Sequence, residues 1–385
     1  AAKGLVLVLG LAVLGALFHS SRLKSLRSPP SWVWPLGLLL IWGGLSALWA
    51  IDPAHSLLAA GRLLTLLASA VILSVFAQSL NDTERQKLLT YAAGSGLVFL
   101  GVFVLDAVSG LALLRYVKGL SNASGGNDYL VYQNPATLSL VLLGFPLGLA
   151  VLQRFGQRWG MAYLIALPAL TIVFAHAQTP GLAALISAIA GFWLAKWIRP
   201  RQAGFAVAAF VLAVPFVIAA LLSLENTWKM AAEFLLGHYV DAHLIPHSLL
   251  HRIGIWNFAL EKLWEQPWLG WGLDGSRVIP GGRADIPNFT HVEVMPLHPH
   301  NGILQVWLEL GVVGAALTAL AGYRIASRLF EQGSLLDRRI ALMTFLTYLI
   351  LLTFSLGAWQ NWWLAVVVLS YFIFCLSKTK TECAS

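Results

Sequence analysis

Long apolar segments recur along almost the whole chain, and they limit its fold more than any other feature of the sequence. A helix of about 20 apolar residues crosses the hydrocarbon layer of a bilayer. The chain is 58% hydrophobic and 11% charged, whereas a soluble domain has about 25% charged residues. The sequence therefore predicts an all-α integral membrane protein, a polytopic bundle of about 11 to 12 transmembrane helices with one large, partly helical loop.

Eleven segments fit a membrane span, and they divide the chain into three regions. Residues 1–223 hold eight spans, residues 224–300 form the large loop, and residues 301–385 hold three spans and a tail. The expected spans are 4–18, 32–50, 57–78, 88–112, 131–153, 160–178, 180–197, 204–223, 301–323, 340–358 and 362–377.

Lysine and arginine gather in alternate loops, which predicts the orientation of the bundle. One set of loops and the tail hold 16 of the 25 basic residues, and the segments on the opposite side hold 8. Because basic loops stay in the cytoplasm, the large loop is expected on the outer face. The net charge of +8 is explained by this topology, so we expect no nucleic-acid partner. The richer loops are 19–31, 79–87, 154–159, 196–202 and 324–339.

The large loop contains seven of the ten histidines, which raises the question of a metal site. His243, His247 and His251 repeat at helical spacing, but Pro246 interrupts them and no HExxH or cysteine partner is present. We therefore expect no metal, and the sequence indicates no cofactor. Residues 250–265 have apolar positions at helical spacing and predict an amphipathic helix within this loop.

Two ionisable residues are expected inside the outer leaflet. Arg62 is about 8 Å deep at 1.5 Å per residue, and Asp106 has a similar depth on the next helix. Buried charges face protein or water rather than lipid. Either the two form a structural ion pair, or they line a hydrated outer cavity.

The segment HPHNGILQVWLELGVVG, residues 298–314, places histidines immediately before a predicted span. His300 could act as a neutral general base, because an imidazole has a pKa near 6.5; the alternative is an ordinary loop histidine. Glu309 is expected to be a structural hydrogen-bond partner. Gly311 and Gly314 are expected to allow close helix packing.

Two further groups carry candidate chemistry. Arg252, one turn before Trp256 on the loop helix, has a fork that suits a diphosphate, although a lone arginine is more often simply exposed. WQNWW, residues 359–363, is interpreted as an aromatic belt in a short hairpin.

Two motifs resemble one known family. HN at 300–301, nine residues, and GVVG at 311–314 are similar to the H-N-x9-G-x-x-G signature of the O-antigen ligase and O-antigen polymerase superfamily. HRIGIWNFALEKLWEQPWLGWG, residues 251–272, resembles that family's Arg-x3-Trp and Pro-x2-Gly-x-Gly segment. Residues 46–64 and 132–149 are similar with less specificity.

The resemblance implies a metal-independent, inverting glycosyl transfer at the periplasmic face of the bacterial inner membrane. The donor would be a glycan on undecaprenyl diphosphate, and the acceptor would be the lipid A–core oligosaccharide. His300 would accept the acceptor proton, Arg252 would neutralise the diphosphate, and Arg62 would contact the diphosphate or the glycan. The other implied substrate-binding residues are Asn301, Trp256, His298, Tyr132, Asn134 and Arg115.

One departure from the family and two alternatives remain open. Many members have Ser-Arg-Gly where this chain has Thr179-Pro180-Gly181, so a cation is missing at Pro180. A polymerase that uses the same lipid-linked donor is the first alternative, although one large loop favours a ligase. A lipid-glycan transporter is the second, but polar residues concentrated near the outer face count against it.

Overall fold

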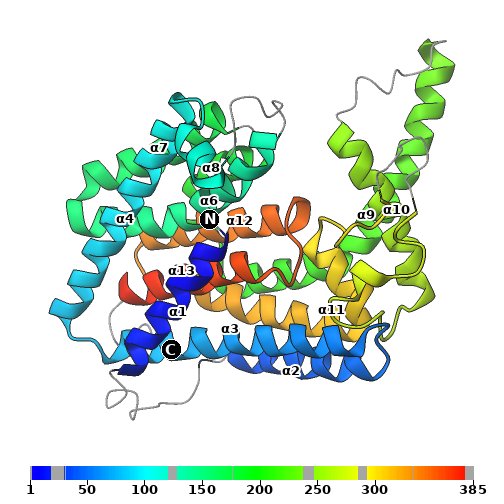
Figure 1. Cartoon of the computed structure of the whole chain (residues 1–385), viewed down its shortest axis with the longest axis horizontal. Coiled ribbons are helices and arrows are strands. Elements are labelled where there is room, and N and C mark those ends of the chain that lie inside the picture. Colours follow the sequence, from blue (N-terminus) through cyan, green and yellow to red (C-terminus); the bar gives the residue numbers. More distant parts are fainter. Residues whose placement is uncertain are drawn as a thin grey trace.

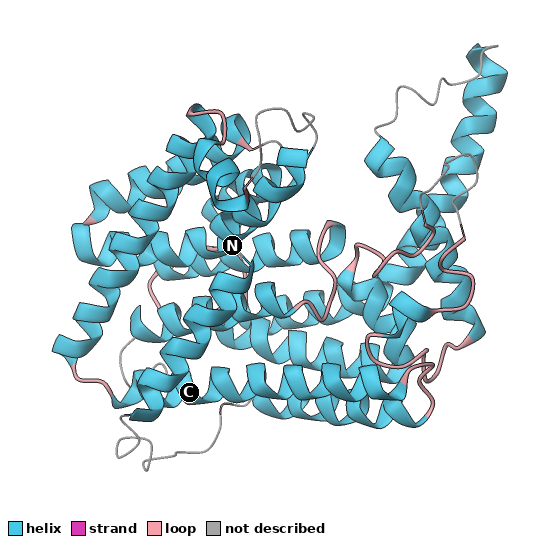
Figure 2. Ribbon diagram, in the orientation of Figure 1, coloured by secondary structure: helices cyan, strands magenta, loops and turns pink. Residues whose placement is uncertain are grey.

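Helices make up almost all of the structure (Figure 2), a computed structural model that describes residues 2–18, 30, 32–119, 128–175, 177–236, 247–284, 293–331 and 333–377. Each of the eleven segments expected to span the membrane contains a helix. Six of the helices in the described ranges are long and apolar enough to cross a membrane, and four more are apolar but shorter. The predicted all-α polytopic membrane fold is confirmed.

The helices are α1 (Ala2–Phe18), α2 (Val33–Leu45), α3 (Pro53–Ser79), α4 (Asp82–Val108), α5 (Ala112–Lys118), α6 (Asp128–Phe155), α7 (Gln157–Phe174), α8 (Gln178–Leu194), α9 (Pro200–Leu236), α10 (His247–Glu265), α11 (Gly302–Leu329), α12 (Leu335–Phe354) and α13 (Asn361–Ser377). The longest interval between consecutive helices lies between α10 and α11 (Figure 1). Short 3₁₀ turns lie at Ser46–Leu48 and Gly275–Val278.

Two helices form the interior of the bundle. In α6, 83% of the most apolar segment is buried, because α4, α7, α12 and α13 all pack against it. In α11, 67% of the most apolar segment is buried, and its main neighbours are α9, α2 and α10. The outer helices α3, α4 and α9 bury only 22 to 28% of theirs. Their exposed leucine and valine side chains are suited to contact lipid.

Two basic side chains, Arg85 and Arg338, donate hydrogen bonds to backbone carbonyl groups of other segments. Arg85 is buried and donates to the carbonyl oxygens of Ala77 and Cys375, at the C-terminal ends of α3 and α13. A cation stabilises such ends because their last carbonyl groups have no helical partner. Arg338 similarly donates to the carbonyl of Ile198. Arg85, from one of the predicted basic loops, therefore caps the ends of two helices.

Near the large loop the structure adds detail to the predicted boundaries. The amphipathic helix expected at 250–265 is α10, which begins at His247. α9 continues to Leu236 rather than ending near residue 223. His243 and His291 lie outside the described residues.

Candidate functional site

The site is built around a break in α11. Gly311 has a φ of 62° and a ψ of −164°, which interrupts the helical path. This backbone region is open essentially to glycine alone. Gly311, expected to allow close packing, does permit close approach of the Trp268 backbone, and its conformation also breaks the helix. A Cβ at this position would also collide with the carbonyl oxygen of Trp268.

The loop after α10 docks against this break. The backbone N–H groups of Trp271 and Gly272 donate to the carbonyl oxygens of Leu308 and Glu309, at 3.1 and 2.8 Å. The indole N–H of Trp42, on α2, donates to the next carbonyl, Leu310, at 3.0 Å. Three acceptors freed by the break are thus satisfied by other segments, as burial in a membrane requires.

Glu309 lies fully buried just before the break and accepts hydrogen bonds from two other segments and from its own helix. Its Oε2 accepts from the Asp274 backbone at 2.6 Å and from Trp359 Nε1 at 2.5 Å. Its Oε1 accepts from Gln305 Nε2 at 2.8 Å, and from both the backbone and the hydroxyl of Ser276. The expected role of Glu309 as a structural hydrogen-bond partner is confirmed.

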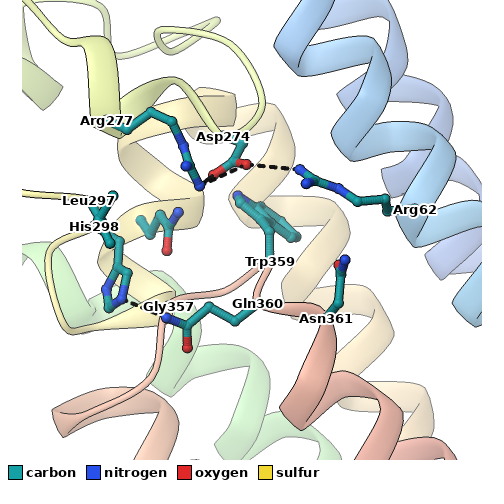
Figure 3. Close-up of a pocket in the computed structure, with 10 residues that line it drawn as sticks. Arg62, Asp274, Arg277, Leu297, His298, Gly357, Trp359, Gln360 and Asn361 are labelled. Carbon is teal, nitrogen blue, oxygen red and sulfur yellow. Dashed lines mark hydrogen bonds and ion pairs between the residues drawn. The ribbon is translucent and has the colours of Figure 1, made fainter. Parts of the chain in front are cut away.

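Three side chains contact the carboxylate of Asp274, whose backbone N–H donates to Glu309. Two of the three, Arg277 and Arg62, are drawn in Figure 3. Arg277 Nη2 donates to both carboxylate oxygens at 2.9 and 3.1 Å. Arg62 Nη2, from α3, donates to Oδ2 at 3.2 Å, and His55 Nε2 lies 2.9 Å from the same oxygen. The proposed Arg62–Asp106 pair is wrong, because Asp106 instead accepts from the backbone of Leu113 and Leu114.

Arg62, Asp274 and Arg277 line a cavity of about 140 Å³. The Arg62 and Arg277 side chains approach Asp274 from opposite sides (Figure 3), one from α3 and the other from the docked loop. The hairpin between α12 and α13 closes the cavity. The remaining lining residues are Leu297, His298, Gln305, Gly357, Trp359, Gln360 and Asn361.

His298 connects this cavity to His300. Its Nδ1 accepts the backbone N–H of His300 at 3.1 Å. Its Nε2 lies 2.9 Å from Gln360 Nε2. Burial, with added repulsion from His300 and Arg277, lowers the pKa of His298 to about 4. His298 is therefore neutral at physiological pH.

His300 has a backbone φ of 51°, an uncommon left-handed value for a non-glycine residue. Its ring lies 4.6 Å from the His298 ring and 6.4 Å from the His251 ring, centroid to centroid. Burial lowers its pKa, a hydrogen bond to the Ser355 backbone raises it, and Arg252 and His251 lower it further. A hydrogen bond that raises the pKa of an imidazole has the ring as its donor. The other ring nitrogen is then an acceptor in the neutral form.

α10 supplies the second wall of the His300 region. Arg252 is half-buried, and this burial lowers its pKa. Trp256 is 9% exposed, and its indole N–H donates to the Pro299 carbonyl at 2.9 Å. Trp256 thereby fixes the turn that presents His300 beside Arg252.

The remaining candidates are more scattered. Asn301 is buried and caps α11, accepting from the backbone of Ile303 and Leu304. Arg115 is on α5 and Asn134 on α6, and neither lines the Asp274 cavity. Tyr132 lies in α6, but its side chain is outside the described part of the structure. Pro180 is buried in the first turn of α8.

The sequence reasoning missed most of the cavity. Asp274 and Arg277 stand in a turn-rich stretch with no motif that marks them. WQNWW was interpreted as an aromatic belt, but Trp359 binds Glu309 and Gln360 contacts His298. The one available signal was the buried Glu309, which implied polar partners without identifying them.

Comparisons with known proteins bear on these residues. Residues 162–319 match the profile of the family described as O-antigen ligase. That range includes α10, the docked loop, the histidine pair and the break in α11, but neither Arg62 nor Trp359.

Three relatives named "putative polysaccharide ligase" come from Rickettsia. The Rickettsia bellii protein is 26% identical over 329 residues, which cover 84% of this chain and 75% of that protein. The Rickettsia conorii protein is 34% identical over 120 residues, 31% of this chain and 29% of that protein. The Rickettsia felis protein is 33% identical over 120 residues, or 31% of this chain and 30% of that protein. No solved structure matches the chain.

Proposed function

This chain is an O-antigen ligase-like family member, and from that premise we propose that it transfers a glycan from undecaprenyl diphosphate to a hydroxyl of a lipid A–core oligosaccharide. The reaction takes place at the periplasmic face of the bacterial inner membrane. The proposed reaction uses no cofactor. Arg252 and His300 carry the chemistry, and Arg62 contributes to the donor site.

The single observation that carries this proposal is the position of His300 at the start of α11, where its ring lies 4.6 Å from the His298 ring and 6.4 Å from the His251 ring of α10. The His300 ring donates one hydrogen bond to the Ser355 backbone, and burial and Arg252 lower its pKa. A ring that donates at one nitrogen presents a basic lone pair at the other. A lowered pKa keeps this lone pair free of a proton at neutral pH. These are the properties of a general base.

The proposed step is one displacement at the anomeric carbon. The acceptor hydroxyl oxygen attacks that carbon while its proton moves to His300. The bond from the anomeric carbon to the diphosphate oxygen breaks, and undecaprenyl diphosphate leaves with the electron pair. Direct attack inverts the anomeric configuration. Because the leaving diphosphate is already weakly basic, no general acid is required, and a positioned Arg252 stabilises the developing charge.

The test is reconstitution of the purified protein with undecaprenyl-diphosphate glycan, with or without lipid A–core. Capped lipid A–core is the product expected of a ligase. Longer glycans formed from the donor alone would instead identify a polymerase. Absence of either product with a folded protein would reject glycosyl transfer.

The base is tested by substituting His300→Gln, which is expected to lower the transfer rate by about 100-fold or more. The matched control is His251→Gln, assayed near pH 8, where a change in the pKa of His300 no longer alters its protonation. The control should retain most of the activity. Equal losses in the two variants would contradict a base at His300.

A further inference from the structure

The hairpin between α12 and α13, residues 355–360, contacts both histidines that precede α11. The His300 ring donates to the Ser355 backbone. Gln360 Nε2 lies 2.9 Å from His298 Nε2, a contact between residues 62 positions apart that the dashed line in Figure 3 marks. A distant segment of the chain therefore fixes the surroundings of the proposed base.

The hairpin encloses the His298 ring, which is 7% exposed as a residue. A Cβ added at Gly357 would lie 2.8 Å from both Cγ and Cδ2 of this ring, so a larger residue would displace the ring or the hairpin. A carboxamide presents an oxygen acceptor beside its nitrogen donor. Gln360 can therefore bind the His298 nitrogen whichever ring nitrogen carries the proton. Together these contacts limit both the position and the rotation of the ring.

The opposite edge of the His298 ring acts on the backbone of His300. His298 Nδ1 accepts the His300 N–H at 3.1 Å, and His300 has a φ of 51°. A non-glycine residue keeps such a left-handed conformation only where the surrounding contacts determine it. The hydrogen bond to His298 is one of these contacts, so a displaced His298 ring would release the backbone that directs the His300 side chain.

The hairpin is itself attached to the interior of the bundle. The backbone N–H of Ala358 donates to Gln305 Oε1 at 2.7 Å, and Trp359 Nε1 donates to Glu309 Oε2 at 2.5 Å. Both acceptors are buried residues of α11. The hairpin therefore has a fixed position relative to the helix that follows His300.

We propose that Gln360 is a positioning residue for the general base, which acts through the His298 ring to keep His300 in the orientation that glycan transfer requires. This inference rests on the proposed function. Gln360 also lines the Asp274 cavity, so a direct contact with the donor is the competing explanation. An indirect role disappears once His298 is removed, whereas a direct contact does not.

A double-mutant cycle on glycan transfer by the purified full-length chain distinguishes these explanations. Gln360→Met keeps the length of the side chain and removes the amide. It should lower kcat by about tenfold or more, because a small displacement of a catalytic group is costly. His298→Ala should lower kcat at least as much. The double variant should match His298→Ala within about twofold. Losses that multiply would overturn the inference.

Asn361→Ala is the matched control for this cycle. Asn361 is the next residue and lines the same cavity, but its side-chain oxygen has no hydrogen-bond partner among the described residues. Its effect on kcat, of whatever size, should multiply with that of His298→Ala. Equal coupling in the control would mean that any change near the hairpin disturbs His298, which would also overturn the inference. Thermal unfolding establishes that each variant is folded, and Gln360→Asn replaces Gln360→Met if the latter is not.

A conservative variant of His298 tests the second contact in the series. The amide oxygen of asparagine is the same number of bonds from Cα as His298 Nδ1, so it can accept the His300 N–H. His298→Asn should therefore transfer glycan several-fold faster than His298→Ala. Adding Gln360→Met to His298→Asn should change the rate by no more than about twofold. Equal rates for His298→Asn and His298→Ala would contradict positioning through Nδ1.

Nuclear magnetic resonance of the full-length chain with isotopically labelled histidine separates this inference from the proposed function. Without any substrate, Gln360→Met should shift the ring signals of both His298 and His300. His55, which contacts Asp274, is the internal control and should not shift. Shifted signals in a protein that transfers no glycan would reject the function and keep the contact series. Transfer by the wild type, with an unshifted His300 signal in the variant, would do the reverse.

Discussion

The two interior helices, α6 and α11, have the same length of 28 residues but opposite internal structures. α6 contains Pro135 and Pro146 and still runs as one helix, enclosed by apolar neighbours. α11 contains no proline, yet it breaks at Gly311 and exposes carbonyl groups that a loop and α2 must satisfy. The difference shows that a helix break is maintained by its partners, whereas proline alone leaves a well-packed membrane helix intact.

The polar contacts differ in the same way. In α6, Thr137 and Ser139 donate to carbonyl groups of their own helix, at Gln133 and Pro135. In α11, Glu309 joins the docked loop, the α12–α13 hairpin and its own helix. Gln133 and Arg154 of α6 also donate to α7 and α4, at the Phe174 carbonyl and at the side chains of Gln86 and Thr90. Each of these side chains joins α6 to one other helix, whereas Glu309 joins α11 to both the docked loop and the α12–α13 hairpin.

The strongest test of this comparison is Gly311→Ala. The substitution should lower the free energy of unfolding by about 3 kcal/mol or more, because alanine is strained at this φ and ψ and its Cβ meets backbone. Thermal unfolding in detergent measures the loss, and glycan transfer should disappear with the docked loop.

The matched control in α6 is Gly148→Ala. There the added Cβ lies 2.6 Å from Leu164 Cδ2, the end of a side chain that can move. A smaller loss of stability is therefore expected. Equal losses would mean that the break in α11 is no more demanding than a tight helix contact.

A second, slightly smaller effect is expected for Glu309→Gln. Five donors surround the carboxylate, and an amide would direct its own N–H groups at some of them. We expect a loss of about 2 to 3 kcal/mol in the free energy of unfolding. Ser139→Ala in α6 removes one local contact and should cost about 1 kcal/mol. If the two variants were equally stable, the contacts of Glu309 to other segments would add nothing.

The sequence predicted the general position of the site but not the identities of the partners that form it. The depth of Arg62 along its helix indicated that it lines a polar cavity, and Arg62 does line the cavity around Asp274. Depth along a helix does not specify which way a side chain points, so Asp106 was chosen and Asp274 missed. Hydropathy likewise located α11, whereas its break depends on hydrogen bonds from a loop about 40 residues earlier. Periodicity carries no information about such contacts.

The third prediction concerns the start of α11, where burial lowers the pKa of His300 and the neighbouring Arg252 and His251 lower it further. The neutral, active base persists as pH falls below 6.5 and is lost only as pH passes the lowered pKa. Arg252→Gln removes a positive neighbour, so the pKa of His300 rises and the acidic limb of the pH–rate profile moves to higher pH. Each profile is compared with its own maximum. The control is Arg283→Gln, which replaces an exposed arginine that follows α10 and should leave the acidic limb where it is. If the limb is also unmoved in Arg252→Gln, Arg252 does not act on His300.

The smallest expected effect comes from Asn301, which caps α11 immediately after His300. Its side-chain oxygen accepts from the backbone of Ile303 and Leu304, so Asn301→Ala should cost about 1 kcal/mol of stability. Asn301→Ser keeps a capping oxygen and should restore most of that loss, as measured by thermal unfolding.

The same pair of variants decides whether Asn301 also binds substrate. The Nδ2 atom of Asn301 is buried and has no hydrogen-bond partner among the described residues, and a hydroxyl cannot replace its two donors. If Asn301 acts only as a cap, Asn301→Ser should transfer glycan with a near-normal KM. A raised KM in a variant of normal stability would instead assign the amide N–H groups to the substrate. α11 would then bind substrate through the residue that caps it.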